Sequence, residues 1–359
     1  MTRSPTAQLD ARRAEALVRQ FASQKILVVG DVILDRFIVG RVTRISPEAP
    51  VPIVRFESEY VRLGGAANVA HNIIALGGSV SLVGVVGIDA AAEKLAGQLQ
   101  RAGVEAGGLI QDAGRPTTEK VRIVTERNQQ VARIDYEHDV DVSVDVERRL
   151  ASRSAHVGRG AKAILVSDYL KGVVTRPLVE TLLADRRTLA AGAAGDRLPP
   201  LIVDPKISHL PCYAGATLVT PNHHEAETAT LRRIRDDNDA REVARDFRHR
   251  ARCESALITR GEHGMWLSTN DVEAAIPSMA REVADVTGAG GKRDDARSCG
   301  PRESRSGRCR REIRARDPDA PGTDQHLQCL KCRRPVTTMA SPRSSAAAMT
   351  SRSRTDPPG

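Results

Sequence analysis

Short apolar runs alternate with segments of helical periodicity along most of this chain. Residues 25–31 (KILVVGD) form a compact apolar run that ends in a Gly–Asp turn, which is typical of a buried parallel strand. Residues 66–78 then place apolar side chains at helical spacing and stop at Gly77, a favourable C-terminal cap. A second strand over residues 80–87 leads to Asp89, the candidate N-cap of a helix that stops at Gly103.

Four later runs repeat this design. Each is a short apolar strand that ends in a polar residue or a glycine, and they cover residues 162–168, 200–206, 216–222 and 255–261. The rhythm predicts an α/β fold, a doubly wound sheet flanked by helices, with ligands bound at the carboxyl ends of its strands.

Two segments interrupt the rhythm. Residues 50–63 and 118–137 have the pattern of antiparallel strands, the second as a hairpin around residues 127–129. We expect these strands to form a small β-flap, or lid, over the site. The Arg-rich residues 231–254 alternate in sign, which indicates a solvated helical face rather than a binding patch.

The composition changes after residue 291. Residues 292–359 contain 16 Lys and Arg against 8 Asp and Glu, whereas residues 1–291 contain 38 against 37. With four Leu, Ile, Val or Phe residues and no aromatic residue, the last 68 residues cannot bury enough apolar surface to fold. We therefore predict a disordered basic tail, and we expect the nearly neutral body not to bind nucleic acid.

Cysteine use and hydropathy indicate the compartment. The body contains two cysteines, Cys212 and Cys253, which favours a reducing environment over a disulfide scaffold. The charged N-terminus lacks the apolar core of a secretory signal, and no apolar run approaches the ~18 residues of a spanning helix. We expect a cytoplasmic protein with no membrane partner.

The strongest chemical signal is a glycine-rich turn at residues 282–291 (EVADVTGAGG). A strand ends at Asp285, and the small residues that follow let successive backbone N–H groups converge at the start of a helix. Such a turn binds phosphate and stabilises the charge that develops during phosphoryl transfer. Taken alone, an ordinary glycine turn is the simpler interpretation.

Four other motifs accompany this turn, in a fixed order along the chain. Two acidic residues flank the end of the first strand, a Gly-Gly pair opens a helix, and two later strands end in polar turns. The residues are Asp31 and Asp35; Gly64, Gly65 and Asn68; Thr220, Asn222 and Glu225; and Thr259, Gly261 and Gly264. Together the five motifs resemble the ribokinase-like (PfkB) sugar kinases over residues 24–291. The resemblance implies a kinase domain over 24–291, truncated at its C-terminal end, between a helical extension (1–23) and an aberrant tail (292–359).

Three longer strings narrow the resemblance. Residues 44–55 (RISPEAPVPIVR), 127–137 (RNQQVARIDYE) and 167–172 (SDYLKG) are similar to kinases that act on D-glycero-β-D-manno-heptose 7-phosphate. The implied reaction is ATP-dependent phosphorylation of the anomeric hydroxyl to the 1,7-bisphosphate, in the synthesis of ADP-heptose, a lipopolysaccharide core precursor. Two alternatives stay open: another PfkB-type sugar or nucleoside kinase, and a catalytically silent remnant that binds sugar phosphate.

On the acceptor side, the resemblance assigns sugar hydroxyls to Asp31 and Asn68, with Asp35 beside them and Gly64 and Gly65 allowing close backbone approach. Alternatively, Asp31 only caps a turn. Three residues of the β-flap and of the 167–172 string complete the expected substrate site: Arg133, Asp168 and Lys171. Arg133 and Lys171 are the candidate partners of the acceptor's own phosphate, because a second anionic group needs cations. The alternative for Arg133 is an ion pair within the flap.

On the nucleotide side, the resemblance implies ATP and Mg²⁺. Asn222 and Glu225 would order the phosphates and Mg²⁺-bound water, with Glu225 acting on the metal through water; the alternative is a helix N-cap. The remaining nucleotide-site residues are Asp204, Lys206, Thr259, Gly261, Gly264, Asp285 and Thr287. A monovalent cation is a candidate near Asp285 and Thr287. His223 and His224 lack a metal-ligand pattern and are expected to be exposed, and a homodimer is compatible with the resemblance.

The chain departs from the family pattern at the position of the general base. Gly288, Ala289 and Gly290 form the expected anion hole, but Gly291 occupies the position of the Asp that acts as general base. Read one base later, residues 293–300 permit a small apolar helix, and one inserted base permits Asp at position 291. A frameshift near this codon explains the lost Asp, the change of composition and the absence of aromatic residues together.

Two other interpretations of the tail are weaker. Cys299, Cys309, Cys329 and Cys332 have irregular first spacing for a zinc site. An Arg-rich nucleic-acid-binding tail would lack aromatic residues for stacking.

Overall fold

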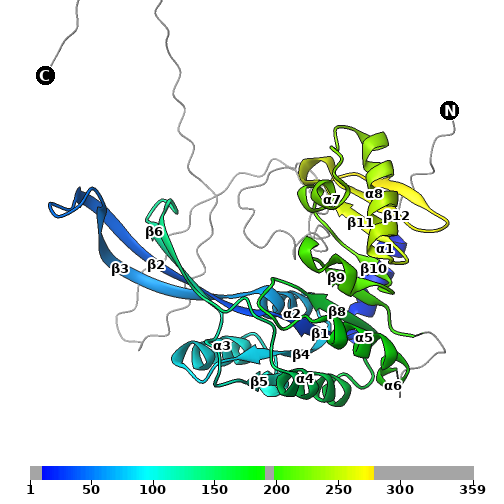
Figure 1. Ribbon diagram of the computed structural model, residues 1–359, viewed down its shortest axis with the longest axis horizontal. Coiled ribbons are helices and arrows are strands. Elements are labelled where there is room, and N and C mark those ends of the chain that lie inside the picture. The colour runs from blue at the N-terminus through cyan, green and yellow to red at the C-terminus, as the bar shows by residue number, and fades with distance from the viewer. Residues whose placement is uncertain (1–9, 191–197, 279–359) are drawn as a thin grey trace, which may run out of the picture. The chain divides into compact units, whose positions relative to one another are not determined.

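The computed structural model describes residues 10–190 and 198–278, and the fold is built from these (Figure 1). Nine strands of this part form one sheet in the order β13-β12-β11-β10-β9-β8-β1-β4-β5. Neighbouring strands are parallel from β5 through to β11, and β12 and β13 are antiparallel. The strands are β1 (Lys25–Gly30), β4 (Ser79–Val86), β5 (Leu109–Gln111), β8 (Ala163–Ser167), β9 (Leu201–Asp204), β10 (Leu218–Val219), β11 (Ala256–Thr259), β12 (Met265–Ser268) and β13 (Glu273–Ile276).

Helices cover both faces of this sheet, as the alternation of strand and helix predicts. In β1, Val28 points into a cluster with α2 (Gly65–Ala75) and α3 (Ala90–Arg101). Its neighbours Leu27 and Val29 point the other way, into a cluster that α4 (Val144–Val157), α5 (Arg176–Ala184) and α8 (Asp237–Ala251) complete. The fully apolar strand is therefore buried on both faces. The other helices are α1 (Ala11–Arg19), α6 (Arg186–Leu189) and α7 (His223–Thr230), with 3₁₀ turns η1 (Gln20–Ser23), η2 (Ala106–Gly108), η3 (Ile207–Tyr213) and η4 (Gly261–His263).

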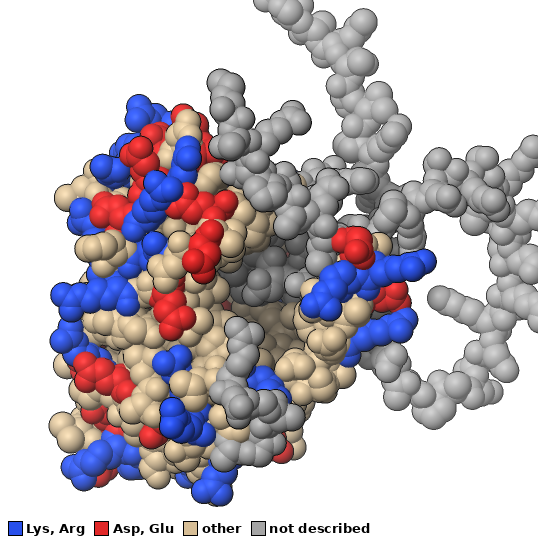
Figure 2. All heavy atoms as spheres, turned by 90° about the vertical axis from the view of Figure 1, so that its right-hand side faces the viewer, with Lys and Arg blue, Asp and Glu red and all other residues tan. Residues whose placement is uncertain are grey.

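The Arg-rich segment forms the amphipathic helix α8. Val243 and Phe247 pack into the core, whereas Arg250 pairs with Asp246 on the outer side at 2.9 Å. The expectation of a solvated helical face is confirmed. Figure 2 likewise shows basic and acidic side chains intermixed over the face that it presents.

A second sheet, of four strands in the order β3-β2-β6-β7, extends away from the first (Figure 1). Its strands are β2 (Val32–Ile45), β3 (Pro52–Gly64), β6 (Glu119–Thr125) and β7 (Gln130–Tyr136). The expected β-flap is confirmed, and we call this sheet the lid. Strand β2, which the sequence did not predict, makes it larger than expected: β2 pairs with β3 along its whole length and with β6 in parallel.

The order of the strands fixes where a ligand can bind. From β1 the chain proceeds to β4 and β5 on one side, and it then returns to β8 and continues through β9, β10 and β11 on the other. Strands β1 and β8 are therefore the point at which the direction of winding reverses. Such a switch point leaves a crevice at the carboxyl ends of the strands.

Candidate active site

The sheet brings most of the predicted residues to one edge. Asp31 follows β1, Asp168 follows β8, and Asp204 ends β9. Asn222 follows β10 and forms a parallel bridge to Thr259, the last residue of β11. Carboxyl groups and polar turns from five neighbouring strands thus lie along the same edge.

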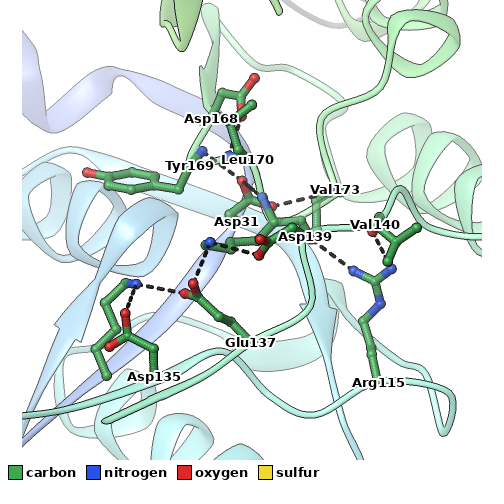
Figure 3. A network of polar contacts seen from close by, with 12 residues as sticks. Asp31, Arg115, Asp135, Glu137, Asp139, Val140, Asp168, Tyr169, Leu170 and Val173 are labelled. Atoms are coloured by element: carbon green, nitrogen blue, oxygen red, sulfur yellow. Dashed lines mark hydrogen bonds and ion pairs between the residues drawn. The ribbon is translucent and has the colours of Figure 1, made fainter. Parts of the chain in front are cut away.

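Asp31 is completely buried and holds the loop that follows β8 (Figure 3). Its Oδ2 accepts hydrogen bonds from the backbone N–H of Tyr169 at 2.7 Å and Lys171 at 3.1 Å, and its Oδ1 accepts one from Val173 at 3.2 Å. Burial raises the pKa of Asp31 to about 6, and the neighbouring Asp168 adds to this while the N–H donors oppose it. The turn-capping alternative thus describes this geometry, and a direct role on sugar hydroxyls stays a prediction.

The Gly-Gly pair permits a close crossing of chains at this point. A Cβ on Gly65, whose φ is +53°, would lie 2.2 Å from the backbone O of Asp31. A Cβ on Gly64 would lie 2.5 Å from Oδ2 of Asp35, a lid residue that forms an ion pair with Arg122. The glycines therefore let helix α2 start against both acidic residues. Asn68, in the first turn of α2, is half-buried, and no other described residue is shown bonding to its amide.

Asp168 organises a second group of side chains that the sequence did not reveal. Its Oδ2 accepts a hydrogen bond of 2.6 Å from the hydroxyl of Tyr213 and lies 2.8 Å from Nδ1 of His209. Its Oδ1 accepts from the backbone N–H of Leu170 at 2.8 Å. Tyr213 and His209 come from η3, more than 40 residues later in the chain, and no local motif marks them.

Asn222 and Glu225 form a complete capping box at the start of α7. The Asn222 side chain accepts from the Glu225 N–H, and Glu225 Oε2 accepts from the Asn222 N–H, each at 2.9 Å. Glu225 Oε1 lies 2.8 Å from Nζ of Lys206. The N-cap alternative is thus realised in the structure, and it leaves Lys206 beside a fixed carboxylate.

Asp204 is the acidic group best suited to a cation. Burial raises its pKa to about 6, the Glu225 carboxylate raises it further, and Lys206 opposes both. Within the described residues, no side chain or N–H is shown donating to this carboxylate. Mg²⁺ is commonly held by one or two carboxylates together with substrate phosphates and water. Asp204 and Glu225 fit this donor set, although no group of three metal-binding side chains converges within the described ranges.

Tyr169 closes this edge of the site. Burial raises its pKa to about 12, and the carboxylates of Asp204, Asp35 and Glu225 add to the shift. Lys206 Nζ lies 5.6 Å from the centre of its ring. The ring therefore lies between the candidate nucleotide residues and the lid. Tyr169 belongs to the 167–172 string, but its residue type alone did not mark it.

The two cations predicted for the acceptor phosphate are both paired. Lys171 lies 2.8 Å from Glu137 and 3.1 Å from Asp139, and its side chain is 13% exposed (Figure 3). Burial lowers the pKa of Lys171, but the hydrogen bonds to these carboxylates outweigh it and the net shift is upward. Arg133 lies 2.9 Å from Asp135, as the alternative for this residue anticipated.

The turn after β11 is tight and rests on its glycines. Gly261 and Gly264 have φ of +62° and +75°, and a Cβ on Gly264 would lie 2.1 Å from the Ile276 carbonyl oxygen. The Arg260 N–H donates to the Gly264 carbonyl at 2.8 Å. His224, beyond the neighbouring β10, is 77% exposed at its side chain, as expected, whereas His223 is half-buried and the same expectation is wrong for it.

Part of the predicted site lies outside the described residues. This applies to Asp285 and Thr287 with their candidate cation, to the anion hole (Gly288, Ala289 and Gly290), to Gly291 and to the tail. Their roles stay predictions. Within the described part of the chain, no helix has the length and apolar character needed to cross a membrane.

Comparisons with known proteins agree with this arrangement. The profile of the pfkB family of carbohydrate kinases matches residues 23–290. The chain is 40% identical over 283 residues to the bifunctional protein HldE of Geobacter sulfurreducens, covering 79% of this chain and 56% of that protein. It is 39% identical over 278 residues to the bifunctional protein HldE of Bradyrhizobium sp., covering 76% of this chain and 55% of that protein. The chain thus spans about half the length of these curated relatives.

Solved structures share the fold. Phosphofructokinase-2 from Escherichia coli, in complex with substrates and products, superposes with a TM-score of 0.59 at 19% identity, over 75% of this chain and 83% of that one. A carbohydrate kinase from Agrobacterium tumefaciens gives 0.55 at 22% identity, over 75% of this chain and 80% of that one. The ribokinase-like architecture expected from the sequence is confirmed.

Proposed function

Because the chain belongs to the pfkB family of carbohydrate kinases, and is by family an ATP-dependent sugar kinase, we propose that its acceptor is D-glycero-β-D-manno-heptose 7-phosphate. The reaction would phosphorylate the anomeric hydroxyl and yield the 1,7-bisphosphate, a step toward ADP-heptose. The relatives that the chain matches at about 40% identity carry the name HldE, and this supports the assignment.

One structural observation carries the proposal. Two of the strings that resemble heptose kinases, residues 127–137 and 167–172, are far apart in sequence but come into contact at the carboxyl ends of the strands. Glu137 from the first string and Lys171 from the second form an ion pair of 2.8 Å (Figure 3). Parts of two of the three strings that distinguish the narrower group therefore meet at one place, whereas residues 44–55 lie at the far end of the lid.

The described residues divide the work of such a kinase. Asp31 fixes the loop at residues 169–173, and Asp168 fixes η3, so both carboxylates act by holding backbone and side chains in place. Lys206 would contact the phosphates of ATP, and Asp204 and Glu225 would hold Mg²⁺ directly or through water. Bound Mg²⁺ would supply charge neutralisation of the phosphates during transfer. The lid would exclude water from the crevice, which limits hydrolysis of ATP.

The step that removes the acceptor proton is the open part of this scheme. The family places an Asp at the position that is Gly291 here, so a second function follows from this one residue: a protein that binds sugar phosphate without turning it over. The cytoplasm and a homodimer stay our expectations for compartment and assembly.

The test compares acceptors in two forms of the protein. Binding of heptose 7-phosphate, fructose 6-phosphate and ribose is measured calorimetrically on this chain, and ATP turnover is measured on a frame-restored chain that regains Asp at 291. We expect both to favour heptose 7-phosphate by at least about tenfold, or about 1.4 kcal/mol. Equal or better use of ribose would remove the heptose assignment and leave the family intact. Binding of a sugar phosphate by this chain without ATP turnover, together with turnover by the restored chain, would establish that this chain is the silent remnant.

A further inference from the structure

One face of the lid carries a group of cations and aromatic rings. Residues directly opposite each other on paired strands share a face, and Asp35 and Phe37 of β2 are opposite Arg62 and Tyr60 of β3. On the other side of β2, the same two residues are opposite Lys120 and Arg122 of β6. We call this set of six the cationic face: Asp35, Phe37, Tyr60, Arg62, Lys120 and Arg122.

Near its base, the opposite face of the lid packs against the hydrophobic core. Leu34 is completely buried, and Val61 and Leu63 pack beside it against the cluster formed with α2 and α3. Because side chains alternate along each strand, the cationic face points away from that cluster. Arg62 is the exposed cation of this face, whereas the side chains of Lys120 and Arg122 are 16% and 19% exposed.

The cationic face is organised around two stacked rings. The rings of Phe37 and Tyr60 lie 4.8 Å apart, centre to centre, at an angle of 7°. The Arg62 guanidinium lies 5.3 Å from each ring centre, and that of Arg122 lies 5.4 Å from the centre of Phe37. Aromatic contact of this kind restricts a guanidinium without neutralising its charge.

Arg62 differs from its cationic neighbours in its pairing. Arg122 pairs with Asp35, Lys120 with Asp135 and Glu137, and Arg133 with Asp135. Arg62 is exposed, and within the described part of the chain no ion pair or hydrogen bond to a carboxylate is shown for its guanidinium. A held but unneutralised arginine is suited to bind an anion with two parallel hydrogen bonds.

The cationic face adjoins the site. Arg62 lies two residues before Gly64, which caps the helix that starts against Asp31 and Asp35. The carboxylate of Asp35 contributes to the raised pKa of Tyr169, so the base of the face lies near that ring. A ligand at the carboxyl ends of the strands can therefore extend onto the lid.

We propose that Arg62 binds the phosphate that the acceptor sugar already carries. The inference rests on the proposed function and names the part of the site that selects a sugar phosphate over a free sugar. It assigns this role to Arg62 ahead of Arg133 and Lys171, because carboxylates already neutralise those two cations. The phosphate dianion would lie against the guanidinium edge that the stacked rings leave open.

The experiment measures binding to this chain, so it does not depend on the missing general base. Calorimetry gives the affinities of heptose 7-phosphate, fructose 6-phosphate and unphosphorylated heptose for wild type, Arg62→Ala and Arg62→Lys. The control is Arg44→Ala, which removes the same charge from the same sheet. Arg44 lies about 30 Å along β2 from Asp35, at the far end of the lid, and no ion pair is shown for it in the described structure.

Wild type will prefer one sugar phosphate. We expect Arg62→Ala to lower the affinity for that sugar phosphate by about 10- to 100-fold. The affinity of Arg62→Ala for unphosphorylated heptose should change by less than about twofold. Arg62→Lys should recover part of the lost affinity for the sugar phosphate. Arg44→Ala should behave as wild type. A general loss of structure would weaken phosphorylated and unphosphorylated sugars alike, and unfolding curves on each variant check for it.

The outcomes separate this inference from the proposed function. If wild type prefers heptose 7-phosphate but Arg62→Ala binds it unchanged, the phosphate site is wrong and the heptose assignment stands. If wild type prefers fructose 6-phosphate and Arg62→Ala lowers the affinity for fructose 6-phosphate but not for the unphosphorylated sugar, the heptose assignment is wrong and the phosphate site stands. An equal loss for phosphorylated and free sugar in a folded variant also overturns the inference.

Discussion

The backbone N–H of Tyr169 donates a 2.7 Å hydrogen bond to the carboxylate of Asp31, which lies 138 residues earlier in the chain. Strands β1 and β8 are hydrogen-bonded neighbours, so the bond joins the first turns after two parallel strands. It places the ring of Tyr169 between the lid and the nucleotide side of the crevice. The acidic residue after β1 therefore acts first on the protein's own backbone.

Removal of this carboxylate should destabilise the fold. Asp31→Ala would leave the N–H groups of Tyr169, Lys171 and Val173 without their acceptor, the first two in a partly buried place and the third in a buried one. We expect the free energy of unfolding to fall by about 2–4 kcal/mol, since each buried unpaired donor costs about 1–3 kcal/mol and loss of the buried charge offsets part of it. Urea denaturation measures the change.

The control for this variant is Asp246→Ala, which breaks a single ion pair on the outer side of α8. We expect it to cost less than about 1 kcal/mol. Proteolysis of Asp31→Ala should also cut first within residues 169–173. Equal stability of the two variants would show that the Asp31 bonds do not hold the loop.

Substitution of Asp204 should have the opposite effect at neutral pH. Its folded-state pKa of about 6 lies above the ordinary value of 3.8, so the folded state binds the proton more tightly than the unfolded state. Ionisation therefore destabilises the fold as pH rises from about 4 to 6, and the cost is complete above that range. Asp204→Asn should raise the free energy of unfolding by about 1–3 kcal/mol at pH 7.5, with no gain below pH 3.8.

Asp239 provides the matched control. The N–H of Arg235 lowers the pKa of Asp239, with burial opposing it and the Arg235 side chain assisting. Its contribution is therefore stabilising at neutral pH and is lost as pH falls through the folded-state pKa. Asp239→Asn should thus lower the stability at pH 7.5 and lose its effect in acid. If both variants change stability in the same direction at pH 7.5, the assignment for Asp204 is wrong.

Lys206 should contribute more to the binding of ATP than to the binding of the acceptor sugar. Its ammonium lies 2.8 Å from Glu225 and above the ring of Tyr169, at the edge assigned to the ATP phosphates. Lys206→Met should weaken ATP binding by about tenfold and leave sugar phosphate binding within about twofold. Lys94→Met, on helix α3, serves as control in the same calorimetric titrations. A loss confined to the sugar phosphate would place Lys206 on the acceptor side instead.

Gly291→Asp alone should not restore good activity. General-base assistance is typically worth ~10²–10⁴-fold in rate. An anion hole also needs a packed helix behind its N–H groups, and the sequence KRDD that follows Gly291, with Pro301 beyond it, does not provide an apolar face. Heptose-dependent ATP turnover is compared for this chain, Gly291→Asp and the frame-restored chain. A single substitution within about tenfold of the restored chain would show that the missing helix does not matter.

The sequence predicted the sheet well because its strands are buried on both faces. Runs such as residues 25–31 are apolar throughout, and their ends are marked by Gly or Asp. Strand β2 escaped prediction because β1 ends at Gly30 and β2 starts at Val32, so only Asp31 separates the two. Its last five residues are exposed, so no continuous apolar run marks it either.

The site was predictable in position but not in partners. Polar residues at strand ends identified Asp31, Asp168 and Asp204, because parallel strands bring their carboxyl ends to one edge. The contact of Tyr213 with Asp168 depends on how η3 packs, and a residue 45 positions away carries no local signal of it. That no ion pair is shown for Arg62 within the described residues is equally invisible in the sequence, because Asp35, the carboxylate directly opposite Arg62, pairs with Arg122 on a third strand instead.

The central place of β1 also governs how the chain can be made. Strand β1 leaves the ribosome well before one of its two neighbours, β8, and before the last donor to Asp31, Val173, which lies 142 residues beyond that carboxylate. At a synthesis rate of roughly 5–20 residues per second, the nascent strand waits on the order of ten seconds with one edge open. The edge of β1 that pairs with β8 can be completed only after residues 163–167 have been synthesised, so a slow stretch of translation before residue 163 would delay it.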